Sequence, residues 1–334
     1  MNQEPSLQLK RMPKWLEFVL TKRFPCALMV VFMLTSAYWF NVLFGNIPLI
    51  GFLMLLVGMV LHLAVPSVFA LVLFGGGLVF SLQVGGIAAL LILLLSSGSM
   101  YAVLVFLALF AVVPVMTGLT MQQRGLGQAS WLLAVSLLVT VFVALMIAMD
   151  SEGLKEYVSQ LFKPLFNSMV AEIPVGEKEA LSSIRQLQNI MVEIFPGLLV
   201  ISVWLAWWGD ILFARKIAKG YGFYQGDEST MLSLVLPKKL VYVLLAFAAI
   251  ANMTDGDIQY VAVNGLLVLA GLMAVQGISV AHTWLKSRGM MNTIVVMYMM
   301  LFFWSVMVLA FVMIGLLDIW FNFRRNIVST TGEK

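Results

Sequence analysis

Charged residues are scarce in this chain, at 11% of 334 residues, while 62% of the residues are hydrophobic. Soluble domains carry about 25% charged and about 45–50% apolar residues. A water-facing surface of this size needs more charge, so a soluble globular enzyme is excluded. A disordered chain or a chain that coats nucleic acid is excluded too, because either would need polar or basic runs. The net charge of +4 is therefore no sign of a nucleic-acid partner.

Cysteine and histidine are rarer still. The single cysteine, Cys26, excludes an internal disulfide and a cysteine-rich metal site. Two histidines, His62 and His282, leave little for a zinc site. The sequence also lacks the Gly-x-x-x-x-Gly-Lys-Ser/Thr phosphate loop, the His-Glu-x-x-His helix and the Gly-x-Ser-x-Gly turn. We therefore expect no metal, no cofactor, no catalytic residue and no ATPase activity of its own.

Long apolar runs are what the chain has in quantity. A helix needs about 20 apolar residues to cross about 30 Å of hydrocarbon, and it satisfies its backbone hydrogen bonds within the segment. The runs predict an all-α, polytopic membrane bundle of eight to nine transmembrane helices with one amphipathic extramembrane segment. The stretch 238–252 is short and must begin near Leu234 or lie thin in the membrane. The nine candidate spans are residues 26–45, 48–73, 77–97, 100–120, 129–149, 194–214, 238–252, 259–281 and 292–317.

Lysine and arginine gather in a few places between the spans. With nine spans and the N-terminus inside, thirteen of the twenty basic residues lie on the inner side. Because inner loops are enriched in lysine and arginine, this bias predicts a cytoplasmic N-terminus. Arg324 and Arg325 are discordant, since nine spans would place them outside. The alternative is an eight-span chain with both ends inside.

The charges and spans predict a linear organisation of five segments. A run of polar residues between the fifth and sixth spans shows apolar residues at three- and four-residue spacing, which is typical of amphipathic helices. We expect Pro164 to kink or end the first of these helices. This run is interpreted either as a lid or docking surface, or as a stripe that rests on the membrane. The segments are 1–24 (basic cytoplasmic tail with an interfacial helix), 25–149 (first transmembrane bundle), 150–193 (amphipathic periplasmic or extracellular segment), 194–318 (second transmembrane bundle) and 319–334 (polar C-terminal tail).

Polar residues inside the spans are candidates for function because they are costly there. His62 precedes Pro66 by four residues, and a proline loosens the preceding turn. We interpret His62 as a residue that binds substrate or moves a proton, or else bonds a neighbouring helix. Gln83, Asn264 and Gln276 complete the candidate substrate-binding set, with hydrogen bonds between helices as their alternative role.

Residues near the ends of spans are interpreted as structural anchors. Asp210 follows three tryptophans that predict a belt at the membrane interface, Trp204, Trp207 and Trp208. A pairing of Asp210 with Arg215 or with another helix is expected. The full set of predicted anchors is Asp210, His282, Asp318, Arg324 and Arg325.

The C-terminal third carries a resemblance to a known family. The stretch LPKK at residues 236–239 leads into a span, residues 276–289 read QGISVAHTWLKSRG, and residues 315–325 read GLLDIWFNFRR. These motifs resemble the YybS-like family of bacterial membrane proteins, also called domain of unknown function 2232. That family is distantly similar to the substrate-binding subunits of energy-coupling-factor transporters. The resemblance implies a helical bundle that binds a small molecule and relies on a separate ATPase.

Two functions are compatible with the sequence. The first is a solute-binding or transport-related subunit that takes a small-molecule ligand and is energised by a partner protein. The second is a membrane scaffold or assembly factor that docks partners through residues 150–193 and the basic loop 214–239. Both place the chain in a lipid bilayer, and neither involves nucleic acid.

Overall fold

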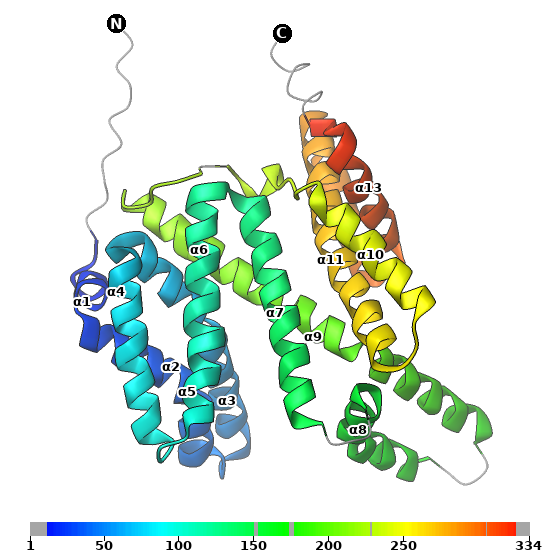
Figure 1. The fold of residues 1–334 in the computed structure, drawn as a ribbon, viewed down its shortest axis with the longest axis horizontal. Coiled ribbons are helices and arrows are strands. Elements are labelled where there is room, and N and C mark those ends of the chain that lie inside the picture. Colours follow the sequence, from blue (N-terminus) through cyan, green and yellow to red (C-terminus); the bar gives the residue numbers. More distant parts are fainter. Residues whose placement is uncertain (1–11, 150–152, 174–176, 228, 305, 325–334) are drawn as a thin grey trace, which may run out of the picture. The chain divides into compact units, whose positions relative to one another are not determined.

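The computed structural model describes residues 12–149, 153–173, 177–227, 229–304 and 306–324, and every regular element in these ranges is a helix (Figure 1). The predicted all-α class is thereby confirmed for the described part of the chain. The first eleven residues, residues 174–176 and Arg325 lie outside the described residues.

In the described part of the chain, six helical stretches are long and apolar enough to cross a membrane, or up to seven if one strongly bent helix pair is a single span. They support a multi-pass membrane protein. By length and composition alone they do not confirm the predicted eight or nine spans. The six stretches are Arg23–Phe44, Pro48–Leu95, Met100–Arg124, Leu126–Ala148, Lys178–Gly220 and Gly256–Ser287.

The chain forms two compact units that are interleaved in sequence. Unit 1 consists of Met1–Gly125 and Trp204–Glu228, and unit 2 consists of Leu126–Val203 and Ser229–Lys334. The long helix α9 (Lys178–Gly220) contributes its first part to unit 2 and its last part to unit 1. The segments expected from the sequence are contiguous, whereas these units are not.

Unit 1 begins with a short helix, α1 (Lys14–Thr21), where the sequence predicts an interfacial helix. Helices α2 (Arg23–Phe44) and α3 (Pro48–Leu63) then pack against each other. Their contact uses small residues: the Ser36 hydroxyl donates to the Gly58 carbonyl at 3.0 Å, and a Cβ atom at Gly58 would overlap the Ala37 backbone. Small residues let membrane helices approach closely.

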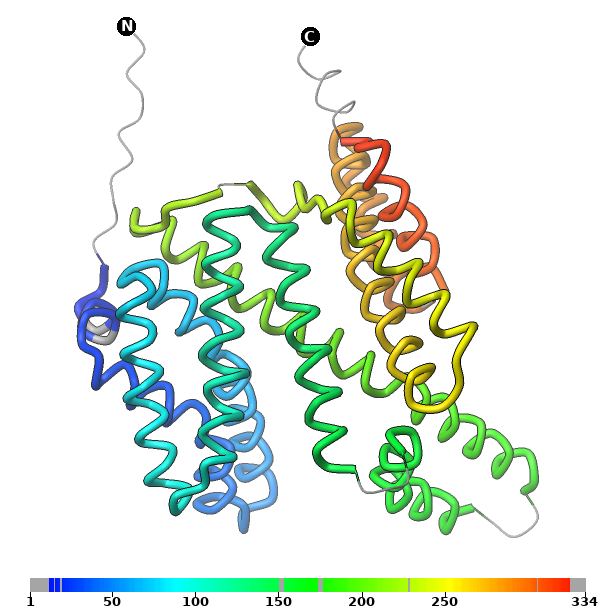
Figure 2. The backbone as a smooth tube through the Cα atoms, viewed as in Figure 1, coloured from blue at the N-terminus to red at the C-terminus, as the bar shows by residue number. Residues whose placement is uncertain are grey.

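Helix α4 (Val65–Leu95) bends sharply at Gly77 (Figure 2). Gly77 has φ +77°, which only glycine adopts readily. The sequence predicts a boundary between two spans at this place. Pro66 does not interrupt the helix because it lies in the first turn, where a proline fits.

The rest of unit 1 comprises α5 (Met100–Val105), the π-helical turn η1 (Phe106–Val112), α6 (Val113–Arg124) and the end of α9. Helix α4 contacts α5, η1 and α6. A π-helical turn inside a span is uncommon.

Unit 2 is arranged around α11 (Gly256–Ser287), the most deeply buried of the spanning helices. Helix α11 contacts α7 (Leu126–Ala148), α8 (Leu154–Ala171), α10 (Lys239–Met253), α12 (Met291–Phe303) and α13 (Met307–Phe321). Figure 1 shows α10, α11 and α13 side by side. Pro164 does not end the helix, because α8 continues through this residue to Ala171. The exposed outer face of α8 leaves room for the strain that a proline introduces.

Helices α11 and α13 run parallel in close contact. Gly277 and Gly315 face each other, and a Cβ atom on either would overlap the backbone of the other helix. Beside this glycine contact Asp318 meets Gln276, and beyond the end of α13 Arg324 meets Ser279 further along α11. The C-terminal ends of α11 and α13 therefore lie at the same end of unit 2.

Helices α12 and α13 form a bent pair, with an angle of 119° between them. Because α13 runs parallel to α11, α12 leads the chain away from the end of α11 and α13 brings it back. With 13 and 15 residues, the two helices are about 20 Å long each, short of the hydrocarbon thickness. The single last span predicted at 292–317 is thus a pair of half-length helices.

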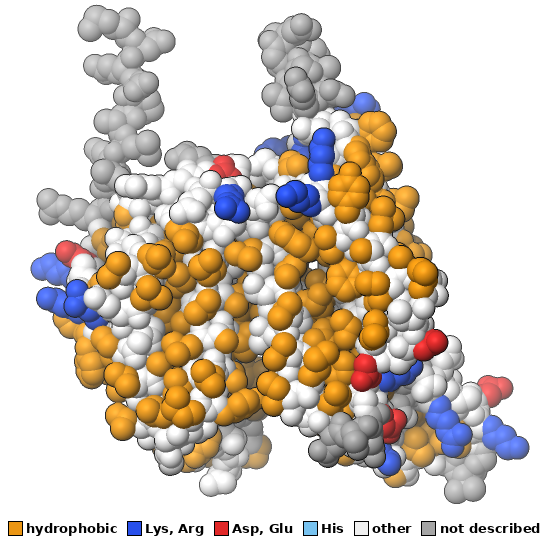
Figure 3. Space-filling model, in the orientation of Figure 1, with side chains coloured by type: hydrophobic (Ala, Val, Ile, Leu, Met, Phe, Trp, Pro, Cys, Tyr) orange, Lys and Arg blue, Asp and Glu red, His pale blue; other side chains and the backbone are white. Residues whose placement is uncertain are grey.

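Hydrophobic side chains cover the helices of each unit on the face in Figure 3, and charged side chains gather near helix ends and around α8. Exposed leucine, valine and phenylalanine side chains are frequent on the spanning helices. An apolar surface whose charges lie near helix ends and around α8 suits a bilayer.

Candidate functional site

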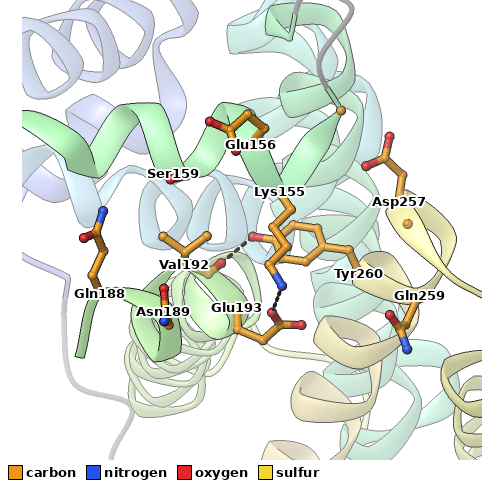
Figure 4. A pocket seen from close by; sticks show the side chains of 12 residues that line it. Lys155, Glu156, Ser159, Gln188, Asn189, Val192, Glu193, Asp257, Gln259 and Tyr260 are labelled. Atoms are coloured by element: carbon orange, nitrogen blue, oxygen red, sulfur yellow. Dashed lines mark hydrogen bonds and ion pairs between the residues drawn. The ribbon is translucent and has the colours of Figure 1, made fainter. Parts of the chain in front are cut away.

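A polar cavity of about 750 Å³ lies in unit 2, between α8, the first part of α9 and the start of α11 (Figure 4). Ligand cavities commonly measure about 300–1,000 Å³. Its lining includes the charged residues Lys155, Glu156, Glu193 and Asp257. The amides of Gln188, Asn189 and Gln259 also line it. The cavity is therefore formed by α8, the first part of α9 and the start of α11.

A proline inside α9, Pro196, follows one turn after Val192, which lines the cavity. Pro196 has no N–H, so it cannot bond the carbonyl of Val192 four residues earlier. The hydroxyl of Tyr260, which is buried on α11, donates to that Val192 carbonyl at 2.6 Å. Tyr260 thus replaces the hydrogen bond that the proline removes.

Asn264 supplies hydrogen bonds to the next turn of α9. Its side-chain oxygen accepts from the Gly197 N–H at 2.8 Å, and its Nδ2 donates to the Glu193 carbonyl at 2.9 Å. These two backbone groups would bond each other in an unbroken helix. A Cβ at residue 197 would meet the Asn264 oxygen at 3.0 Å, so glycine at this position leaves room for the inserted amide. Two residues of α11 therefore clamp α9 at the level where Glu193 faces the cavity.

An ion pair crosses the cavity from α8 to α9. The Lys155 ammonium lies 2.5 Å from a Glu193 carboxylate oxygen (Figure 4). The Lys155 side chain is 59% exposed and that of Glu193 is 35% exposed. Such solvent-exposed pairs contribute about 0–1 kcal/mol, so this contact is easily broken.

Asp257 connects the start of α11 to the start of α8. One of its carboxylate oxygens accepts from the Leu154 N–H at 2.8 Å. The first N–H groups of a helix have no partner within that helix, and a carboxylate there also interacts favourably with the helix dipole. Asp257 therefore fixes the N-terminal end of α8 beside the cavity.

The charges of the lining are unbalanced. Among the described residues, three carboxylates (Glu156, Glu193 and Asp257) face a single ammonium, Lys155. The remaining polar groups are amides and hydroxyls, which both donate and accept hydrogen bonds. The cavity can thus hold a hydrophilic molecule and favours positive over negative charge.

A second polar cluster lies at the opposite end of α11. Asp318 and Arg324 form a buried ion pair at 2.7 Å, and Gln276 donates to the same Asp318 oxygen at 2.8 Å. Asn322 ends α13 with φ +43°, a left-handed conformation that asparagine tolerates, so the chain turns back toward α11. The Phe323 N–H occupies the other Asp318 oxygen at 2.9 Å. Both oxygens of Asp318 are thereby used within the protein.

This cluster holds the segment 229–238, which has no regular structure apart from the short 3-10 helix η2 (Met231–Ser233). The Arg324 guanidinium donates to the carbonyls of Leu232 and Leu234 at 2.6 Å each, and the Gln276 oxygen accepts from the Leu236 N–H at 2.8 Å. Leu234 and Leu236 are fully buried. Non-helical backbone needs such partners when it is removed from water.

In unit 1, His62 lies at the end of α3. Its Nδ1 is 2.9 Å from the Leu34 carbonyl, and since a carbonyl accepts, Nδ1 carries the proton. The His62 ring also meets Phe110 of η1 edge-on. Gln83, the other candidate of unit 1, is half-buried on α4. The contact of His62 with α2 is the interhelical bond that the sequence offers as its alternative role.

The end of α9 differs from the expected interfacial belt. Trp204, Trp207 and Trp208 are buried, and the rings of Trp204 and Trp208 stack. Their large apolar rings fill the interior of unit 1, which gains more from burial than from a place among headgroups. Arg215 donates to the Asp227 carbonyl and lies over the Tyr224 ring, while Asp210 is half-buried.

The predicted substrate-binding residues do not line the cavity in Figure 4. Asn264 and Gln276 instead make buried hydrogen bonds to the backbone of other segments. The predicted anchor His282 reaches the Tyr298 hydroxyl at 3.0 Å and so connects α11 to α12. The lining was missed because its charged residues lie on a segment that reads as water-exposed. The spacing of Tyr260 and Asn264, one turn apart, together with a proline in the α9 run, is the signal that points there.

The sequence matches a model of a protein family. A model of predicted membrane proteins, DUF2232, matches residues 42–319, more than four fifths of the chain. The chain belongs to this family. No curated protein and no solved structure matches it. The DUF2232 match includes all the described residues that line the cavity, as well as Gln276 and Asp318, and it ends just before Arg324.

Proposed function

We propose that this DUF2232 protein is a solute-binding, transport-related subunit of the bacterial cytoplasmic membrane. The observation that carries the proposal is the polar cavity of about 750 Å³ where α8 covers the ends of α9 and α11. A scaffold needs no such cavity, whereas a solute-binding subunit does. The proposal includes no catalytic step, no cofactor and no nucleic acid.

The energy source of the proposed transport is a separate protein. The sequence contains no phosphate-binding loop, so ATP hydrolysis would come from a partner, as in the energy-coupling-factor transporters that the family distantly resembles. The test is purification of the tagged protein from its native membrane: copurification of an ATPase would support this part of the proposal.

The proposed topology has eight crossings with both ends in the cytoplasm. Pro48–Leu95 then crosses twice, with its turn at Gly77, and α10 crosses with the help of the segment 229–238 that precedes it. The α12–α13 pair enters from the cytoplasmic side and returns to it. Sixteen of the twenty lysines and arginines then lie inside, including Arg324 and Arg325. This agrees better with the inside-positive bias than nine crossings do.

With this topology the cavity opens on the outer face. The cavity lies at the start of α11, and the α11–α13 ends with Lys286 and Arg324 lie at the other end of unit 2. An outer cavity is where a solute would be captured before import.

The test is ligand binding by the purified full-length protein. A chemically broad panel of small polar solutes is screened for a rise in melting temperature, since a ligand at 100 times its Kd stabilises the folded state by about 2.7 kcal/mol. A hit should lose its effect in Glu193→Gln and keep it in Lys163→Gln, because Lys163 is exposed on α8 outside the cavity. If no solute in the panel stabilises the protein, the proposal is wrong.

A scaffold or assembly factor is the second candidate, favoured by one observation. Helix α8 exposes Leu161 and Leu165, and α9 exposes Leu187 and Ile190. Such residues pack either on lipid or on a partner protein. A photo-crosslinker at Leu165 separates the two: a reproducible protein adduct favours the scaffold, and lipid adducts favour the solute-binding subunit.

A further inference from the structure

The outer cavity already contains an ammonium group. The Lys155 Nζ atom lies 2.5 Å from Glu193 and spans the cavity between α8 and α9. Because this pair is exposed to solvent, its net contribution is small, and an ammonium from solution can take its place at little cost. Lys155 therefore shows which chemical group the Glu193 carboxylate accepts here.

The surroundings of this ion pair add further acceptors. Glu156 lines the same cavity, and Asp257 retains acceptor capacity beyond its bond to the Leu154 N–H. When an incoming cation displaces Lys155, the positive charge of that cation compensates the negative charge of the lining. An anionic solute would face three carboxylates without compensation, which is repulsive in a partly enclosed space.

The rest of the lining suits an organic molecule better than a bare metal ion. Amide groups of Gln188, Asn189 and Gln259 offer donors and acceptors for hydroxyl, carbonyl or carboxylate groups of a solute. Within the described residues, no three His, Cys, Asp or Glu side chains converge in a way that could hold a metal ion. The cavity is also far larger than a metal site requires.

We infer that the solute of this cavity is a small organic cation whose ammonium group binds Glu193 in place of Lys155, which acts as a tethered competitor. The inference rests on the proposed solute-binding function and names its substrate class. Glu193 is held in position because Asn264 and Tyr260 clamp the adjoining turn of α9.

The experiment compares three probes of similar length and different charge on the full-length protein: 1,4-diaminobutane, 1,4-butanediol and succinate. Binding is measured by calorimetry and melting temperature at constant ionic strength. The diamine should bind, and the diol and the dianion should bind about tenfold or more weakly, because they lack a charged donor for Glu193. Glu193→Gln should weaken diamine binding by a similar factor.

Lys155→Met provides the second, independent variant. Lys155 is exposed, so this variant should fold even if Glu193→Gln does not. Removal of the competitor should tighten diamine binding by about two- to fivefold, which corresponds to a weak exposed ion pair. The matched control, Lys163→Met, removes a lysine from the same helix outside the cavity and should leave binding unchanged.

The outcomes separate this inference from the proposed function. If the diol or succinate binds as tightly as the diamine, or if Lys155→Met does not tighten diamine binding, the substrate class is wrong while a solute-binding function stands. If the wider solute panel and all three probes fail to bind, the proposed function is wrong and the inference falls with it.

Discussion

At the scale of single residues, the amide of Asn264 makes hydrogen bonds that replace one missing from the α9 backbone. It bonds the Gly197 N–H and the Glu193 carbonyl, and its remaining amide hydrogen is shared with the Tyr260 carbonyl of its own helix. Every polar atom of this fully buried side chain thus has a partner. An amide used in this way is not available to a substrate, which favours the interhelical role over the substrate-binding role.

The first prediction concerns this amide. Asn264→Ala should lower the free energy of unfolding by about 1–3 kcal/mol, because two buried backbone groups lose their partners. The measurement is reversible denaturation in mixed micelles. Asn252→Ala is the control, since the Asn252 amide is exposed and bonds only the Ala248 carbonyl of its own helix. Equal small effects at both positions would show that Asn264 is not a clamp.

The second prediction concerns the buried pair of Asp318 and Arg324. Arg324→Met should cost about 3–5 kcal/mol, because it leaves the fully buried Asp318 without a counter-charge. Adding Asp318→Leu to this variant should recover part of the loss, since no buried charge then remains. If the double variant loses the sum of the two single losses, the ion pair is not the reason for the destabilisation.

At the scale of elements, the sequence predicts most helices but not their partners. The apolar runs locate the spanning helices, and the glycines at 75–77 locate the turn in α4, because both signals are local. The cavity is not predictable in this way. Its charged lining comes from residues 155, 193 and 257, which are far apart in sequence and meet only after α8 folds over α9 and α11. Asp318 and Arg324 read as end anchors, yet their bonds to the 229–238 segment depend on the parallel packing of α13.

The third prediction tests that packing. Gly277→Ala should destabilise the protein by about 1–3 kcal/mol, because the added methyl overlaps the backbone of α13 and forces the helices apart. The control is Gly209→Ala, an exposed helical glycine with open space around it. Alanine there should be neutral or stabilise the helix by up to about 1 kcal/mol. Unfolding of both variants in micelles gives the comparison, and a neutral Gly277→Ala would contradict the close contact.

At the scale of the whole molecule, the distribution of charge and the course of unit 2 both support the proposed topology of eight crossings. If the chain crosses the membrane nine times, Arg324 and Arg325 lie on the outer side. The half-length helices α12 and α13 remove that conflict, since α13 returns to the end of α11 and buries Arg324 beside it. The hydrophobicity of residues 292–317 could not reveal this, because a bent pair and a single span have the same composition.

The fourth prediction follows from this topology. On a Cys26→Ser background, a membrane-impermeant maleimide should label Ser183→Cys in intact cells, because Ser183 is exposed and the proposed topology places the start of α9 outside. Ser287→Cys, at the end of α11, and Phe323→Cys, just beyond α13, should be labelled only after the membrane is opened. Both positions are exposed in the folded protein, so a lack of labelling in intact cells reflects sidedness and not burial. Labelling of Phe323→Cys together with Ser183→Cys in intact cells would mean that the α12–α13 pair crosses the bilayer once, and that the C-terminal arginines are a true exception to the inside-positive bias.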